Sequence, residues 1–100
     1  MSNNLNPPSD DWNIYTWMRE IRKSPYLSRT ASHVGLVLAG YMDKRGTCYP
    51  RIALIAEDAR RSRSTIQRTL RELEKAGHVV REVRRGSSTV YWGTVWGWDL

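Results

Sequence analysis

The chain has 100 residues, enough for one domain and too few for a second catalytic domain. Its 16 Lys and Arg against 10 Asp and Glu give a formal net charge of +6, which favours a polyanionic partner, most often nucleic acid. One cysteine excludes an internal disulfide, and no apolar run approaches the roughly 20 residues of a membrane span, so we expect a cytoplasmic, nucleoid-associated protein with no membrane partner.

The chain begins with a polar stretch. Residues 1–10 hold almost nothing to bury, so we expect a flexible N-terminal arm, followed by a single domain over residues 11–100. A first helix is predicted after the arm, on an apolar stripe that begins at Ile14, with Asp10 or Asp11 as its N-cap.

A second helix is predicted over residues 28–42, where apolar residues form a broad face and Ser28 or Thr30 can serve as N-cap. Residues 47–49 are short and β-prone, which predicts an edge strand. Pro50 stands where a third helix would begin, because proline is favoured in the first turn of a helix.

A fourth helix is predicted between Ser62 and Gly77. Its apolar residues recur at spacings of four and three, as on one side of a helix. They are Ile66, Leu70, Leu73 and Ala76. Ser62 or Ser64 can cap its start, Ser64 has capping-box spacing to Gln67, and Gly77 is a plausible residue just past its end.

The pattern becomes strand-like beyond the fourth helix. Residues 79–83 and 89–96 are predicted strands, and residues 84–88 are the turn between them. The fold class is therefore α+β, mainly α, with a C-terminal β-hairpin and an extra N-terminal helix.

Two helices joined by a tight turn and followed at once by a hairpin make an arrangement that binds DNA. The N-terminal half of the fourth helix has a polar, acid-free side suited to base edges, since Arg pairs with guanine and Gln with adenine. The residues expected to contact bases are Arg63, Ser64, Thr65, Gln67 and Arg68. The alternative is that this side is only a solvated charged surface.

The hairpin turn is basic as well, and its arginines suit phosphates or a minor groove. The residues expected to contact the DNA backbone are Arg51, Arg60, Arg61, Arg71, Arg84, Arg85, Ser87 and Ser88. The alternative is an ordinary hairpin whose arginines keep the chain soluble.

Three runs resemble the winged helix-turn-helix domains of bacterial, plasmid and phage regulators and replication proteins. They are GTCYP at 46–50, IAED at 55–58 and SRSTIQR at 62–68, and the resemblance covers about residues 28–92. It implies that the predicted base-contacting residues of the fourth helix face DNA and that the hairpin is the wing.

The chain departs from this family at three arginines. Arg51 replaces the serine that usually caps the third helix, and Arg60 and Arg61 replace the glycine and small apolar residue of the turn. A non-glycine residue in a left-handed turn costs about 1 kcal/mol or more. Either the turn differs, or arginine is tolerated there for its charge.

No catalytic or metal-binding constellation is evident, so no enzyme activity, cofactor or metal is expected. His33 and His78 lack Cys or acidic partners at ligand spacing. His33 is expected on a helix surface and His78 at a helix-to-strand junction, exposed or facing phosphate. Cys48 is expected to fill a small apolar gap.

The five tryptophans permit two interpretations. They can cover the core together, or some of them can form a protein interface, which would suit a homodimer on two half-sites. The candidate interface residues are Trp12, Trp17, Trp92, Trp96 and Trp98.

We therefore expect a sequence-specific double-stranded DNA-binding protein, a small transcriptional regulator with helix 62–77 in the major groove and turn 84–88 on the backbone or minor groove. One alternative is a plasmid or phage replication-origin or excision accessory protein. Another is a winged helix that binds protein.

Overall fold

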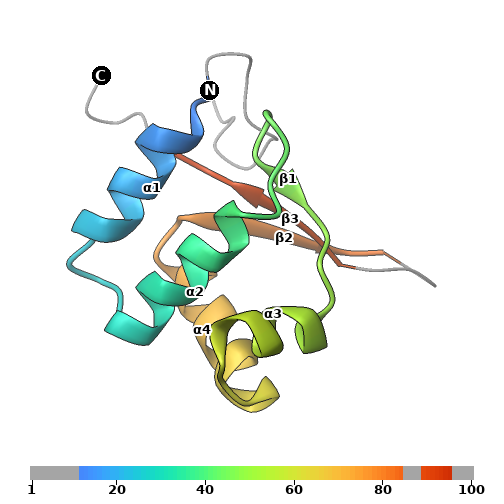
Figure 1. Cartoon of the computed structure of the whole chain (residues 1–100). Coiled ribbons are helices and arrows are strands. Elements are labelled where there is room, and N and C mark those ends of the chain that lie inside the picture. Colours follow the sequence, from blue (N-terminus) through green and yellow to red (C-terminus); the bar gives the residue numbers. More distant parts are fainter. Residues whose placement is uncertain (1–11, 85–88, 96–100) are drawn as a thin grey trace.

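Four helices and three short strands make up the part of the chain that the computed structural model describes, residues 12–84 and 89–95 (Figure 1). The elements are α1 (Ile14–Lys23), α2 (Arg29–Ala39), β1 (Thr47–Cys48), α3 (Ile52–Ala59), α4 (Arg63–Lys75), β2 (Val79–Val83) and β3 (Thr89–Gly93). This order confirms the predicted α+β, mainly α class with an additional N-terminal helix. The expected N-terminal arm, residues 1–10, lies outside the described residues.

The three strands form one antiparallel sheet in the order β1-β3-β2. β1 is an edge strand, as predicted, and its Thr47 pairs with Trp92 of β3. β3 ends at Gly93, which pairs with Val79 at the start of β2. The predicted strand over residues 89–96 was therefore too long: β3 ends where β2 begins, although one further bond joins the amide of Thr94 to the carbonyl of His78.

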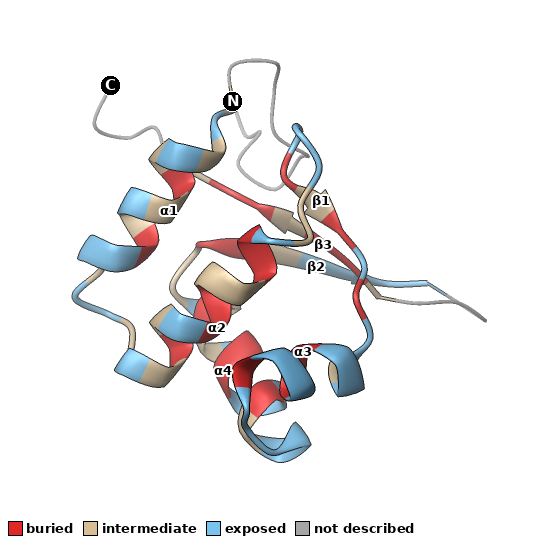
Figure 2. Cartoon of the chain, viewed as in Figure 1, coloured by how far each residue is buried: buried red, intermediate tan, exposed pale blue. Residues whose placement is uncertain are grey.

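The core lies between the sheet and the helices, with α2 packed against α1, α3 and α4 (Figures 1 and 2). Trp17 of α1 is fully buried in it, and its indole Nε1 donates a hydrogen bond of 2.8 Å to the carbonyl of His78. Of the two interpretations drawn from the sequence for Trp17, core and interface, the core holds, since its side chain has no exposed surface. Its bulk is accommodated by Gly93, where an added Cβ would lie 2.9 Å from the indole ring.

Three of the four described helices, α1, α2 and α4, begin at side-chain caps, although not always at the predicted ones. Asn13 caps α1, because its side chain accepts from the amides of Tyr15 and Thr16; the expected Asp10 and Asp11 lie at or before the limit of the described residues. Ser28 caps α2, as one of the two predictions had it. The cap of an α-helix satisfies amides that have no partner within the helix.

Two helix limits differ from the sequence prediction. α2 ends at Ala39 rather than Met42, because the amides of Gly40, Tyr41 and Met42 bond to carbonyls three residues back, a tighter turn than the α-helix. Pro50 precedes α3 instead of starting it, since the first helical amides bond to the carbonyl of Arg51.

Cys48 and His78, two residues singled out in the sequence, are both buried. Cys48 is 1% exposed, and burial raises the pKa of its thiol to about 12. His78 is 6% exposed, which corrects the expectation that it is exposed or faces phosphate. It is buried because its backbone joins α4 to the sheet: the carbonyl of His78 accepts from Trp17 and from the amide of Thr94.

Among the described helices, none is long and apolar enough to cross a membrane.

Candidate nucleic-acid interface

α4 is anchored along one side and free along the other. Ile66, Leu70 and Leu73 are buried against α2 and α3, and Thr69 between them donates its hydroxyl to the carbonyl of Ile66. Thr69 is thus part of the core side, although a threonine could equally have faced outward. The buried stripe fixes which residues of α4 can meet a partner.

The outward side of α4 lies opposite this stripe. At about 3.6 residues per turn, five exposed residues fall on this side. They are Ser64, Gln67, Arg68, Arg71 and Lys75. We call them the α4 outward face. Three of the five predicted base-contacting residues, Ser64, Gln67 and Arg68, belong to it.

The other two predicted base-contacting residues lie on the flanks of the helix. Arg63 is exposed at its first position, and Thr65 is half-buried. The hydroxyl of Thr65 accepts from Ser62 at 3.0 Å, and Ser62 in turn accepts from the amide of Thr65 at 3.2 Å. Ser62 is the N-cap, whereas Ser64 lies within the helix, so the predicted Ser64–Gln67 capping box is not formed.

The turn between α3 and α4 has the left-handed geometry that glycine usually supplies. Arg60 has φ 58 and ψ 46, and no other non-glycine residue of the described ranges has positive φ. The amides of Arg60 and Arg61 bond to the carbonyls of Glu57 and Ala56. Of the two alternatives drawn from the sequence, a different turn is excluded, and arginine occupies the strained position.

The surface formed by this turn and α4 is rich in exposed arginines, and the turn is drawn as exposed in Figure 2. Five of its arginines are exposed, and no carboxylate in the described part of the chain forms an ion pair with any of them. They are Arg60, Arg61, Arg63, Arg68 and Arg71. The first turn of α4 contains no acidic residue, and its helix dipole adds to the positive potential.

The remaining backbone-contact predictions fall at the start of α3 and on the hairpin. Arg51 is exposed at the N-cap of α3 and makes no side-chain cap bond. Arg84 is exposed at the end of β2 and pairs with Glu82 at 3.6 Å. Predictions for Arg85, Ser87 and Ser88, and for Trp96 and Trp98, fall outside the described residues.

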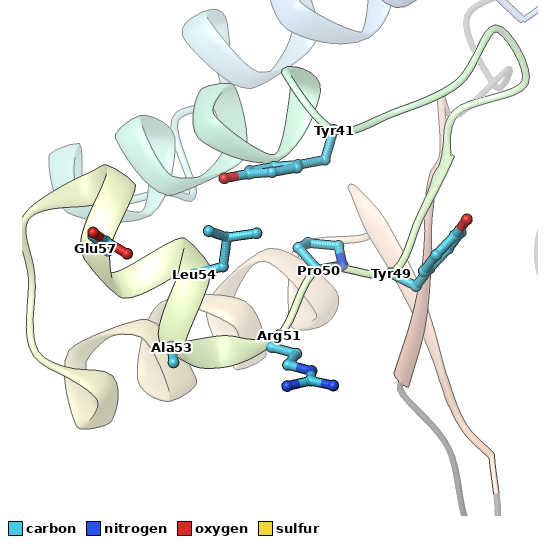
Figure 3. A pocket seen from close by; sticks show the side chains of 7 residues that line it. All are labelled: Tyr41, Tyr49, Pro50, Arg51, Ala53, Leu54 and Glu57. Carbon is cyan, nitrogen blue, oxygen red and sulfur yellow. The ribbon is translucent and has the colours of Figure 1, made fainter.

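A groove of about 640 Å³ lies between the end of α2 and α3 (Figure 3). Tyr41, Pro50 and Leu54 make it largely apolar, while Glu57 adds a negative and Arg51 a positive charge. The Tyr41 hydroxyl donates to Asp58, and this bond raises the pKa of Tyr41 to about 12, which keeps the hydroxyl protonated. The groove thus carries charges of both signs around an apolar centre, whereas the α4 side carries five exposed arginines without an ion pair to a described carboxylate.

The comparison with known proteins agrees with this geometry. A family model described as a helix-turn-helix domain matches residues 26–79, the segment from just before α2 to the start of β2. The chain belongs to the helix-turn-helix domain family. No curated protein and no solved structure matches it.

Membership of this family implies DNA binding, with α3 and α4 as the two helices of the motif. The sheet that follows gives the helix-turn-helix a winged layout, with β2 and β3 as the wing strands. The fold expected from the sequence is thereby confirmed.

One contact that orients the helix-turn-helix could not be found from the sequence. Glu72 of α4 accepts from the backbone amide of Ser28 at 2.6 Å and from the Ser28 hydroxyl at 3.1 Å. The carboxylate thus caps the positive end of α2 from another helix. Because the two residues are 44 positions apart, no local spacing rule could have paired them.

Proposed function

We propose that the chain is a sequence-specific double-stranded DNA-binding protein that acts as a small transcriptional regulator. The observation that carries this proposal is the α4 outward face, in which Gln67 and Arg68 are exposed on a helix whose opposite side is buried. A major groove about 12 Å wide admits such a helix, where Arg can bond guanine and Gln can bond adenine. Bound in this way, the chain would regulate by occupying its site.

The phosphate contacts in this proposal come from arginines around α4. Arg60 and Arg61 in the turn, Arg51 at the start of α3 and Arg71 on α4 are exposed and unneutralised among the described residues. Arginine suits phosphate because its planar fork donates two parallel hydrogen bonds. The wing, residues 84–88, would contact the backbone or a minor groove.

Selection from a random duplex library is the first test, because the enriched duplexes identify the preferred site directly. On the selected duplex, we expect R68A or Q67A to weaken binding by about 1–3 kcal/mol and to relax the preference at one position. K44A is the control: Lys44 is exposed in the turn between α2 and β1, outside the α4 outward face, and its variant should keep the affinity and the preference.

The wing is tested separately with R85A. This change should weaken binding to all duplexes about equally and lower the slope of log affinity against log salt by about one unit. If R68A, Q67A and R85A all bind like the unmodified chain in fluorescence anisotropy, the proposed contacts through α4 and the wing are wrong. If no duplex is enriched or bound, the DNA proposal fails and a protein-binding winged helix takes its place.

A further inference from the structure

A second basic surface lies on α1, away from the α4 outward face. At about 3.6 residues per turn, four exposed residues share one side of α1. They are Tyr15, Arg19, Arg22 and Lys23, and we call them the α1 basic face. Tyr15 is 77% exposed, so its ring contributes almost nothing to the core.

The positive charge of this face is not neutralised within the described part of the chain. No described carboxylate forms an ion pair with Arg19, Arg22 or Lys23. Glu20 lies on the adjacent side of α1, where it is half-buried and where its charge acts on His78. Three cations therefore stand together beside one exposed phenol ring.

The opposite side of α1 is already occupied by the core. Trp17 and Ile21 are fully buried, so α1 has no free apolar side to insert into a membrane. Protein interfaces usually have an apolar or aromatic centre, and this face offers only Tyr15. Arginine forks and a tyrosine hydroxyl are instead groups that contact DNA phosphates.

The two basic surfaces lie on different parts of the molecule. α2 lies between α1 and the α3–α4 pair, with α1 at the upper left of Figure 1 and the α3–α4 turn at the bottom. The persistence length of DNA is about 150 bp, so a short duplex seated on α4 does not curve back to α1. A single short duplex thus reaches one surface and leaves the other free.

We propose that the α1 basic face binds a second segment of duplex DNA, so that one molecule holds two DNA segments together. This inference rests on the proposed function, in which α4 binds the first segment. It adds an activity, bridging, that occupancy of a single site does not require.

The test uses two duplexes of about 20 bp, each shorter than the persistence length. The selected duplex is fixed to beads and saturated with the protein, and retention of a second, fluorescent duplex is measured. For R19Q/R22Q we expect affinity for the first duplex within about twofold of the unmodified chain, and at least about fivefold lower retention of the second. K44Q/R45Q is the control, since it removes the same charge from exposed residues of the turn between α2 and β1, outside both basic surfaces, and should keep retention.

Each other outcome overturns the inference in a recognisable way. If the first duplex binds and the second is never retained, bridging is wrong while the proposed function stands. If R19Q/R22Q retains the second duplex fully, bridging arises elsewhere, as in a pair of protein copies. Retention of fluorescent polyglutamate in place of the duplex would identify an acidic protein as the partner. Failure to bind even the first duplex refutes the proposed function itself.

Discussion

At the scale of single residues, Arg60 is the described non-glycine residue with a strained, positive-φ backbone. Its left-handed conformation closes α3 with the same two hydrogen bonds, to carbonyls three and five residues back, that Gly77 and His78 use to close α4. Gly77 adopts this geometry without steric cost, whereas for an L side chain it costs about 1–2 kcal/mol. A strained position that holds a charged, exposed side chain is best explained by what that charge binds.

We predict that Arg60→Gly stabilises the fold and weakens DNA binding together. Relief of the left-handed strain, less the greater freedom of glycine in the unfolded chain, should raise the free energy of unfolding by about 0.5–1 kcal/mol. Loss of one phosphate contact should lower the salt slope by about one unit. Urea denaturation and anisotropy titrations measure the two effects.

Arg60→Ala separates the two contributions, since it removes the charge and keeps the strain. It should bind DNA as weakly as Arg60→Gly while leaving the free energy of unfolding close to that of the unmodified chain. A glycine variant no more stable than the alanine variant would mean that the strain does not exceed the entropic cost of glycine, and the predicted stabilisation would be wrong.

At the scale of elements, α4 is placed by a polar contact as well as by its buried stripe. The carboxylate of Glu72 receives two hydrogen bonds from Ser28, which is itself the N-cap of α2. A second acidic residue of α4, Glu74, pairs with Arg81 of β2 at 3.3 Å, but both side chains are over a third exposed. The first contact joins two helices at a helix end, and the second is a surface ion pair.

We therefore predict unequal costs for two similar substitutions. Glu72→Ala should lower the free energy of unfolding by about 1–2 kcal/mol, because it leaves the Ser28 amide and the positive end of α2 without their acceptor. Glu74→Ala should cost about 0.5 kcal/mol or less, as exposed ion pairs do. Equal losses in urea denaturation would contradict the orienting role of Glu72.

Most elements could be predicted from local rules, and the errors occur where longer-range contacts decide. The apolar spacing of Ile66, Leu70 and Leu73 defined the buried side of α4, and Gly77 marked its end. The end of β3 depended on where its partner strands stop, which no pattern within β3 records. The surroundings of Thr65 depended on Ser62, whose hydroxyl donates to the Thr65 hydroxyl and accepts from the Thr65 amide.

At the scale of the whole molecule, His78 lies where α1, α4 and the sheet meet. Its carbonyl accepts from Trp17 of α1 and from Thr94 after β3, and its Nδ1 is buried without a hydrogen-bond partner in the described structure. Burial lowers the pKa of the imidazole, and the charge of Glu20 opposes this only in part. The sequence correctly predicted that His78 lies at the junction between helix and strand, but not that it is buried. Its burial depends on Trp17, which is 61 positions away, and no local pattern around His78 indicates that contact.

This burial makes stability depend on pH in a definite direction. The unfolded chain takes up a proton at His78 near pH 6.5 and the folded chain only at lower pH, so the stabilisation is complete above about 6.5 and is lost as pH falls. Between about pH 7.5 and 5.5, the free energy of unfolding should fall by at most about 1.4 kcal/mol from this group. Urea denaturation of the unmodified chain at both pH values measures the fall.

Two variants assign the pH effect. In His78→Gln, the free energy of unfolding should fall much less between these two pH values, whatever the substitution does to stability at neutral pH. His33→Gln should keep it, since His33 is exposed on α2. If the free energy of unfolding falls as much in the His78 variant, the pH dependence comes from carboxylates and not from this imidazole.

The buried thiol of Cys48 is a natural probe of how often the fold opens. Thiol reagents attack the thiolate, and a thiol that is 1% exposed with a pKa of about 12 offers them neither access nor charge. Since the chain holds no other cysteine, labelling can occur only when β1 parts from β3 or the whole fold unfolds. Comparing the labelling rates with and without DNA would then show whether DNA bound at α4 slows the opening of the sheet at β1. The measurement uses the native chain and needs no introduced probe.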